Sequence, residues 1–179
     1  MIGINAGKNS LIYRCNNIYP PPIIDYDTYD FIRIPLTIDK KEYLLLIESY
    51  DFVDNPDMLT SFFYQGDGIL LVFGIDNKES FEKLKEIKEK IKVKNIEGKF
   101  PMLLVGNKKD LEDERKISFD EAKSLAELWG IEYLETSAKN NYNCKEVFEK
   151  IARFVLEYRS ISKGIKVKDN KKKSSCLIY

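Results

Sequence analysis

The chain has 179 residues, 44% of them hydrophobic, which is enough for the core of one domain and too few to expect two. Its 29 basic and 29 acidic residues cancel, so no overall positive field indicates a nucleic-acid partner. Three widely spaced cysteines favour a reducing compartment over a disulfide framework, and Cys15 and Cys144 are expected to be ordinary buried thiols. Apolar runs such as Ile69 to Phe73 are far too short to span a bilayer.

The first ten residues, MIGINAGKNS, partly match a phosphate-binding loop. Such a loop reads GxxxxGK[ST] and follows a strand. Gly7 and Lys8 fit the end of this pattern and precede helix-like residues 10–13, but Gly3 stands one position too close and Asn9 replaces the hydroxyl residue. This match alone does not decide whether the segment is a working phosphate site, a decayed phosphate site or a coincidence.

A hairpin is predicted next, followed by repeated strand and helix units. Two β-branched or apolar runs, Phe31 to Ile38 and Tyr43 to Ile47, are separated by the polar turn Asp39-Lys40-Lys41. The later units have buried strands at Ile69 to Phe73 and Met102 to Val105, a short strand at Ile131 to Leu134, and amphipathic helices at Ser80 to Val93, Ser118 to Leu128 and Lys145 to Tyr158. Repeated units of this kind predict an α/β fold with a mostly parallel sheet and ligand loops at the carboxyl ends of its strands.

Two polar loops follow the second and third of these strands. Their sequences are Gly106-Asn107-Lys108-Lys109-Asp110 and Glu135-Thr136-Ser137-Ala138-Lys139. In a chain rich in lysine and asparagine, Asn-Lys-Lys-Asp alone could be a solvated loop. Its place after a buried strand, with Ser-Ala-Lys after the next strand and Gly-Lys upstream, argues against coincidence. In this order and at these strand ends, the loops resemble the guanine-recognition motifs of the Ras superfamily of small GTPases.

The resemblance covers nearly all of residues 2–179 and is closest to the Ras subfamily. It implies the three-layer sandwich of a P-loop NTPase, with a mostly parallel sheet, one antiparallel hairpin strand and a truncated first central strand. Only Met1 and Ile2 precede the phosphate loop, so either another segment fills the central position or the natural chain begins upstream. We expect an N-terminally truncated Ras-like G domain over residues 1–162 and a basic flexible tail over residues 163–179.

The resemblance implies that GTP or GDP binds at these loops. It assigns guanine binding to six residues, Asn107, Lys108, Asp110, Ser137, Ala138 and Lys139. A carboxylate there can accept two N–H bonds from an edge of guanine that adenine lacks. Backbone N–H groups near Gly7 can form an anion nest, and Lys8 would reach the β- and γ-phosphates. The implied phosphate-binding residues are Asn5, Ala6, Gly7, Lys8, Asn9 and Ser10.

The metal and catalytic positions depart from the family pattern. Mg²⁺ would be held by Asn9, Thr28 and Glu48, and the long Asn9 side chain predicts weakened binding. The family's glutamine that orients the attacking water is replaced by Val53 or, with a one-residue slip, by Phe52. No catalytic residue is assigned, and GTP hydrolysis is expected to be weak.

The end of the chain predicts a membrane anchor. Lys171, Lys172 and Lys173 precede a C-a-a-X box, Cys176-Leu177-Ile178-Tyr179, whose cysteine is a candidate for prenylation. A prenyl group alone anchors weakly, and each nearby lysine adds about 1 kcal/mol against anionic lipid. Tyr179 is an unusual last residue, so the kind of prenyl group stays open.

The favoured function is a Ras-like GTP/GDP signalling switch with slow or impaired hydrolysis, tethered to the cytoplasmic face of a membrane, with the plasma membrane favoured, or cytosolic if unprenylated. Effector proteins would bind the switch surfaces, Asp25 to Phe31 and Glu48 to Tyr64. The alternative is a pseudo-GTPase, a lipid-anchored interaction module without productive nucleotide cycling. A generic P-loop phosphotransferase is disfavoured because Asn107, Lys108 and Asp110 specify guanine.

Overall fold

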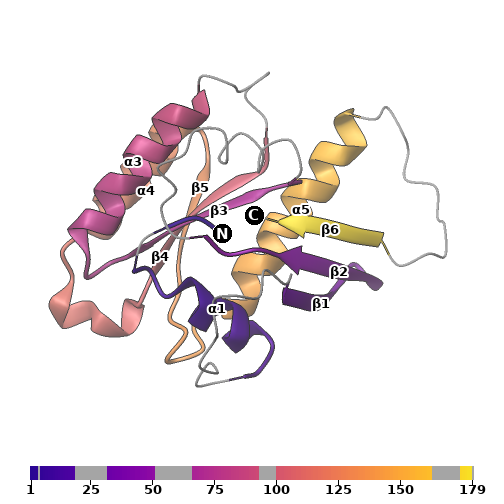
Figure 1. Cartoon of the computed structure of the whole chain (residues 1–179), viewed down its shortest axis with the longest axis horizontal. Helices are drawn as coiled ribbons and strands as arrows, with labels where there is room; N and C mark the ends of the chain where they lie inside the picture. Colours follow the sequence, from indigo (N-terminus) through magenta and orange to yellow (C-terminus); the bar gives the residue numbers. More distant parts are fainter. Residues whose placement is uncertain (4, 19–31, 51–65, 93–99, 163–173, 179) are drawn as a thin grey trace.

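The computed structural model in Figure 1 describes residues 1–3, 5–18, 32–50, 66–92, 100–162 and 174–178, with residues 90–92, 162 and 174–178 described as backbone alone. It confirms the α/β fold, because helices cover two three-stranded sheets. One sheet has the strand order β1-β2-β6 and the other has the order β3-β4-β5. Among the helices of the described part of the chain, none is long and apolar enough to cross a membrane.

The predicted hairpin is present. Strands β1 (Ile32–Ile38) and β2 (Lys41–Ile47) pair antiparallel, so β2 begins at Lys41 rather than at Tyr43. Asp39 and Lys40 form the turn with φ values of 50° and 65°, which matches the twist of a two-residue hairpin loop. Buried and exposed residues alternate along β1, so one face of the hairpin packs on the core.

The three predicted strand and helix units follow, with their strands in parallel pairing. Their strands are β3 (Ile69–Gly74), β4 (Met102–Asn107) and β5 (Glu132–Glu135), and their helices are α3 (Lys78–Lys92), α4 (Phe119–Trp129) and α5 (Cys144–Ser162). Helix α1 (Lys8–Cys15) precedes the hairpin, and a 3-10 helix, η1 (Lys109–Glu114), that the sequence did not predict follows β4. Every residue of β3 and β4 is buried, which is typical of strands covered on both faces.

Two hydrophobic clusters lie on opposite faces of the β3-β4-β5 sheet. Leu70 and Val72 of β3 pack with α1 and α5, whereas Leu71 and Phe73 pack with α3 and α4. This alternation follows from the two-residue period of a strand. The packing holds the carboxyl ends of the three parallel strands at one edge, where the predicted ligand loops begin.

Segments from both ends of the chain lie beside the edge of β2 that faces away from β1. Ile2 makes parallel bridges to Tyr50 and to Leu71, and so joins the two sheets. Its N–H donates to Leu70 at 3.0 Å, and its carbonyl accepts from Val72 at 2.8 Å. Strand β6 (Ser174–Ile178) pairs in parallel with β2. The sequence predicted a truncated central strand near this position and did not predict a strand at the end of the chain.

Candidate functional site

The phosphate-loop segment turns sharply into α1. Gly7 precedes the helix with φ 68° and ψ 32°, a left-handed conformation that favours glycine. A Cβ atom at Gly7 would lie 2.9 Å from Nδ2 of Asn107, and one at Gly3 would lie 1.9 Å from the carbonyl oxygen of Val72. Because Gly7 offers no side chain to the first N–H groups of α1, these donors can serve a bound anion.

The side chain of Lys8 folds back over this loop. It is 6% exposed, and its Nζ donates to the carbonyl of Gly3 at 2.7 Å. A buried amine needs such oxygen partners because its transfer out of water is costly. The loop therefore holds a cation at the N-terminus of α1, where the helix dipole also favours negative charge.

The side chain of Asn107, at the end of β4, connects three loops. Its Nδ2 donates to the carbonyls of Ala6 at 2.8 Å and of Gly7 at 3.3 Å, both in the phosphate-loop segment. Its Oδ1 accepts from the hydroxyl of Thr136, after β5, at 3.0 Å. Asn107 is 1% exposed, so its amide is satisfied within the protein and fixes the three loops relative to one another.

The carboxylate of Asp110, in η1, faces the loop after β5. Ser137 donates from Oγ to Oδ1 of Asp110 at 2.5 Å, and Nζ of Lys139 lies 4.0 Å from Oδ2. Ser137 in turn accepts from the N–H of Asn140 at 3.1 Å. An ionised carboxylate accepts several hydrogen bonds, so Asp110 can hold Ser137 and further donors at once. The structure thus brings together the two loops that carry the six residues predicted to bind guanine.

Lys108 is held from a third loop that the sequence analysis did not include. Its Nζ lies 3.0 Å from Oδ2 of Asp76, which follows β3. The other oxygen of Asp76, Oδ1, is buried and has no hydrogen-bond partner among the residues that the structure describes. Asp76 lies two residues after the end of β3, so a polar residue close after a buried strand marks this loop as it marks the other two, but that pattern does not identify the contact with Lys108.

Comparisons with known proteins decide the family. The family model described as "Ras family" matches residues 2–157. The Ras-related protein O-RAL of Diplobatis ommata is 38% identical over 180 residues, which cover 98% of this chain and 85% of the relative. The Ras-related protein ralB-B of Xenopus laevis is 38% identical over 160 residues, which cover 87% of this chain and 77% of the relative. The Ras-related protein Ral-B of Mus musculus is 37% identical over 158 residues, which cover 86% of this chain and 76% of the relative. The chain belongs to the Ras family.

Membership of the Ras family confirms the resemblance seen in the two guanine-type loops. The protein is therefore a GTP-binding signalling protein of the small GTPase class, whose members bind GTP and GDP with Mg²⁺ and act on effector proteins. The three-layer Ras-like fold agrees with this assignment.

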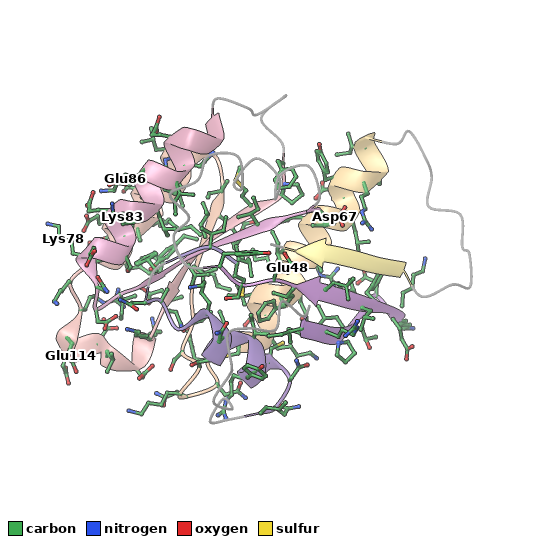
Figure 2. The ribbon with its side chains drawn as sticks, viewed as in Figure 1. Glu48, Asp67, Lys78, Lys83, Glu86 and Glu114 are labelled. Atoms are coloured by element: carbon green, nitrogen blue, oxygen red, sulfur yellow. The ribbon has the colours of Figure 1, made fainter. Side chains whose placement is uncertain are left out.

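The metal candidates of this Ras-family chain are described in part. Asn9 is half-buried in the first turn of α1. Glu48 follows β2, and its carboxylate accepts a hydrogen bond from the hydroxyl of Tyr50. In Figure 2, Glu48 lies toward the middle of the molecule, away from the exposed side chains of α3 such as Glu86. Within the described ranges, no three His, Cys, Asp or Glu side chains gather to hold a metal ion. Amide and carboxylate oxygens suit Mg²⁺, but Glu48 already has a partner in Tyr50.

Several predicted positions lie outside the described residues. These include Thr28, the alternative glutamine positions Phe52 and Val53, the surface at 25–31 and residues 51–64 of the second surface. Of the second surface, only Glu48 to Tyr50 is described.

A network of charged side chains surrounds the buried Glu135 and supports the loops after β4 and β5. The sequence did not predict this network. Glu135, 4% exposed at the end of β5, accepts from Arg115 at 2.8 Å, from Lys109 at 2.6 Å and from the hydroxyl of Tyr133 at 2.9 Å. Burial opposes the charge on Glu135, but hydrogen bonds from Arg115, Lys109 and Tyr133 outweigh it and hold the pKa of the carboxyl below its ordinary value. The hydrogen bond to Glu135 also raises the pKa of Lys109. The network ties the η1 region to the loop after β5.

Proposed function

We propose that this protein is a membrane-tethered guanine-nucleotide switch that holds GTP or GDP between the phosphate loop and the loops after β4 and β5, and that hydrolyses GTP slowly. The observation that supports this most is the buried Asn107 amide, which contacts Ala6, Gly7 and Thr136 at once. Because one amide satisfies groups from all three loops, the loops are preorganised and less ordering is needed when the nucleotide binds.

The guanine base is recognised by the loops after β4 and β5. Asp110 accepts the two N–H groups of the guanine edge, while Ser137 orients its carboxylate. The stem of Lys108 lies along the base, and the backbone N–H of Ala138 donates to the guanine O6. Lys139, 4.0 Å from Asp110, adds positive charge beside that carboxylate.

The phosphates are bound by the segment from Asn5 to Ser10. Its backbone N–H groups and the start of α1 form the anion nest, and Lys8 exchanges the Gly3 carbonyl for the β- and γ-phosphates. Asn9 and Glu48 contribute oxygen ligands to a weakly held Mg²⁺. An apolar side chain at Val53 or Phe52 cannot orient the attacking water, so hydrolysis is slow.

Prenylation of Cys176 supplies the membrane tether. The thiolate sulfur displaces diphosphate from the first carbon of a prenyl diphosphate, so a C–S bond forms as a C–O bond breaks. The thiol proton passes to a base of the transferring enzyme. The lysines at 171–173 then add attraction to anionic lipid at the cytoplasmic face.

Nucleotide binding is tested by purifying the full chain without added nucleotide, denaturing it and identifying what is released, with and without Mg²⁺. Recovered GDP or GTP is expected. Asp110→Ala should weaken GDP binding about 100-fold through the loss of two charge-assisted hydrogen bonds. Asp113→Ala, an exposed carboxylate of the same η1 helix, is the matched control and should bind as the natural chain does. An empty protein that shows no thermal shift with either nucleotide contradicts the proposal.

The alternative is a pseudo-GTPase that serves as a lipid-anchored interaction module. The observation that favours it is the engagement of the Glu48 carboxylate by Tyr50, which competes with a metal ion for that side chain. A single-turnover measurement of GTP decay distinguishes the nucleotide switch from the pseudo-GTPase. We expect measurable but slow decay that depends on Mg²⁺, whereas a chain that binds GTP and never converts it supports the alternative.

A further inference from the structure

Strand β6 and Ile2 lie on the same side of the segment that runs from β2 to Tyr50. The register of β6 places Ser174 opposite Tyr43 and Ile178 opposite Ile47, in parallel. Farther along the same side, Ile2 bridges Tyr50, again in parallel. Figure 1 shows β6 running beside β2. The C-terminal segment and Ile2 therefore extend the sheet along one line.

The partner strand gives a physical reason for this pairing. With β6 in place, Leu45 and Ile47 of β2 are 0% exposed, so the pairing keeps the backbone groups beside them away from water. Buried N–H and C=O groups need hydrogen-bond partners, and β6 supplies a parallel strand for this edge. β6 ends with Ile178, a β-branched residue of the kind that suits a strand.

The cysteine of the C-a-a-X box is inside this strand. In the backbone register of the two strands, Cys176 is opposite Leu45. An enzyme that transfers a prenyl group must bind the last residues of the chain and reach the Cys176 sulfur. The backbone groups that pair with β2 cannot be bound by that enzyme at the same time.

We propose that residues 174–178 form a removable strand: paired with β2, they withhold Cys176 from prenyl transfer, and released, they become the membrane anchor. The proposal rests on the proposed lipidation of Cys176. Eleven residues separate Ser162 of α5 from Ser174, so release and return are intramolecular and need no separation of the tail from the domain. The rate of modification then follows the fraction of molecules in which the strand is released.

The first test measures access to the Cys176 thiol in the full chain. A thiol reagent is added in buffer and in urea, and peptide mass spectrometry follows each cysteine separately. We expect Cys176 to react at least about 10-fold more slowly in buffer than in urea, after correction for the effect of urea on the reagent. Cys144, which is 1% exposed, is the internal example of a protected thiol. Equal rates for Cys176 in the two conditions overturn the proposal.

Substitutions before the cysteine test the strand itself. Ser175→Pro removes a backbone donor inside β6 and should bring Cys176 labelling in buffer to within about 3-fold of the rate in urea. Ser174→Pro is the matched control, because the first residue of a strand tolerates proline, and its effect should be smaller. Ser175→Val favours a strand and should slow labelling. Hydrogen exchange of the amides of Tyr43 to Ile47 should quicken in Ser175→Pro alone, and a uniform response of the three variants overturns the proposal.

A prenyl-transfer assay separates this proposal from the lipidation on which it rests. With a prenyltransferase and farnesyl or geranylgeranyl diphosphate, Ser175→Pro should be modified about 10-fold faster than the natural chain and Ser175→Val more slowly. Equal prenylation of all variants overturns the withholding strand while leaving lipidation intact. If the Cys176 thiol of Ser175→Pro is labelled rapidly but receives no prenyl group, the lipidation and the anchor role are refuted. Slow labelling of Cys176 in the natural chain would still confirm the pairing of β6 with β2.

Discussion

The amide of Asn107 donates to the carbonyl of Ala6 at 2.8 Å, although the two residues stand 101 positions apart in the sequence. One belongs to the loop after β4 and the other to the phosphate-loop segment. The same side chain accepts from Thr136 after β5. One buried amide therefore joins the phosphate-loop segment to the loops after β4 and β5, which makes Asn107 an informative residue to change.

Asn107→Ala should loosen the site and destabilise the fold. The change leaves the carbonyl of Ala6 and the hydroxyl of Thr136 without their partner, whereas the carbonyl of Gly7 keeps the N–H of Leu11, and the loss costs about 2 to 3 kcal/mol of unfolding free energy. Bound GDP should dissociate at least about 10-fold faster, because the loops are no longer preorganised. Urea unfolding and the release of a fluorescent GDP analogue measure the two effects. Asn140→Ala, an exposed asparagine of the neighbouring loop, should change neither. Unaltered release from Asn107→Ala would show that the nucleotide orders the loops by itself.

Gly3 is required for steric reasons, and its substitution should be costly. An alanine Cβ would lie 1.9 Å from the carbonyl oxygen of Val72, so Gly3→Ala must displace backbone and should lower the unfolding free energy by about 3 kcal/mol. Gly130→Ala is a useful comparison. Gly130 has φ 66° with nothing near its Cβ position, so that change should cost about 1 kcal/mol from backbone conformation alone. Chemical denaturation of the two variants gives the comparison, and equal costs would contradict the close approach of Gly3 to β3.

The parts of the fold that the sequence predicted correctly carry strong local patterns. Ile69 to Phe73 and Met102 to Val105 are continuous apolar runs, and both are strands buried on two faces. The hairpin was visible from two apolar runs around Asp39 and Lys40. The loops after β4 and β5 were recognisable because polar motifs follow such strands directly. In each case the information lies within a few neighbouring residues.

Strand β6 and the partner of Lys108 could not be predicted in this way. The five residues of β6 follow a lysine-rich run, and nothing local distinguishes them from a tail, because their pairing depends on a hairpin far upstream. Asp76 is 32 positions from Lys108, and their contact exists only because β3 and β4 are neighbours in the sheet. Lys108 precedes the short η1 helix with a φ of 67°, a left-handed conformation that is uncommon for lysine and that no residue pattern indicates. Tertiary pairing decides the first two features.

Replacing Glu135 should change the pH dependence of stability. Because the folded-state pKa of this carboxyl is lowered, its charge stabilises the fold above the ordinary value of 4.5, and this contribution is lost as the pH falls through the folded pKa. Glu135→Gln should therefore lower the unfolding free energy by about 2 kcal/mol at neutral pH. The difference from the natural chain should shrink below pH 4.5. Urea unfolding across this range measures it. Glu114→Gln, an exposed carboxylate of η1, should show no such convergence, and a difference for Glu135→Gln that stays constant with pH would contradict the assigned role.

Replacing Asp76 should weaken nucleotide binding, because Asp76 positions the side chain of Lys108. The ion pair of 3.0 Å positions the Lys108 amine, and both side chains are partly shielded, with exposed fractions of 30% for Lys108 and 19% for Asp76. Asp76→Ala lets the lysine move among rotamers, so GDP release should quicken about 5-fold, the factor expected from losing about 1 kcal/mol of positioning. Stability without nucleotide should change less, because the buried Oδ1 of Asp76 has no partner in the described structure and its removal offsets the lost ion pair. Glu79→Ala, an exposed carboxylate in the first turn of α3, is the control. If GDP release were unchanged in Asp76→Ala, contacts to the base alone would be sufficient to place Lys108.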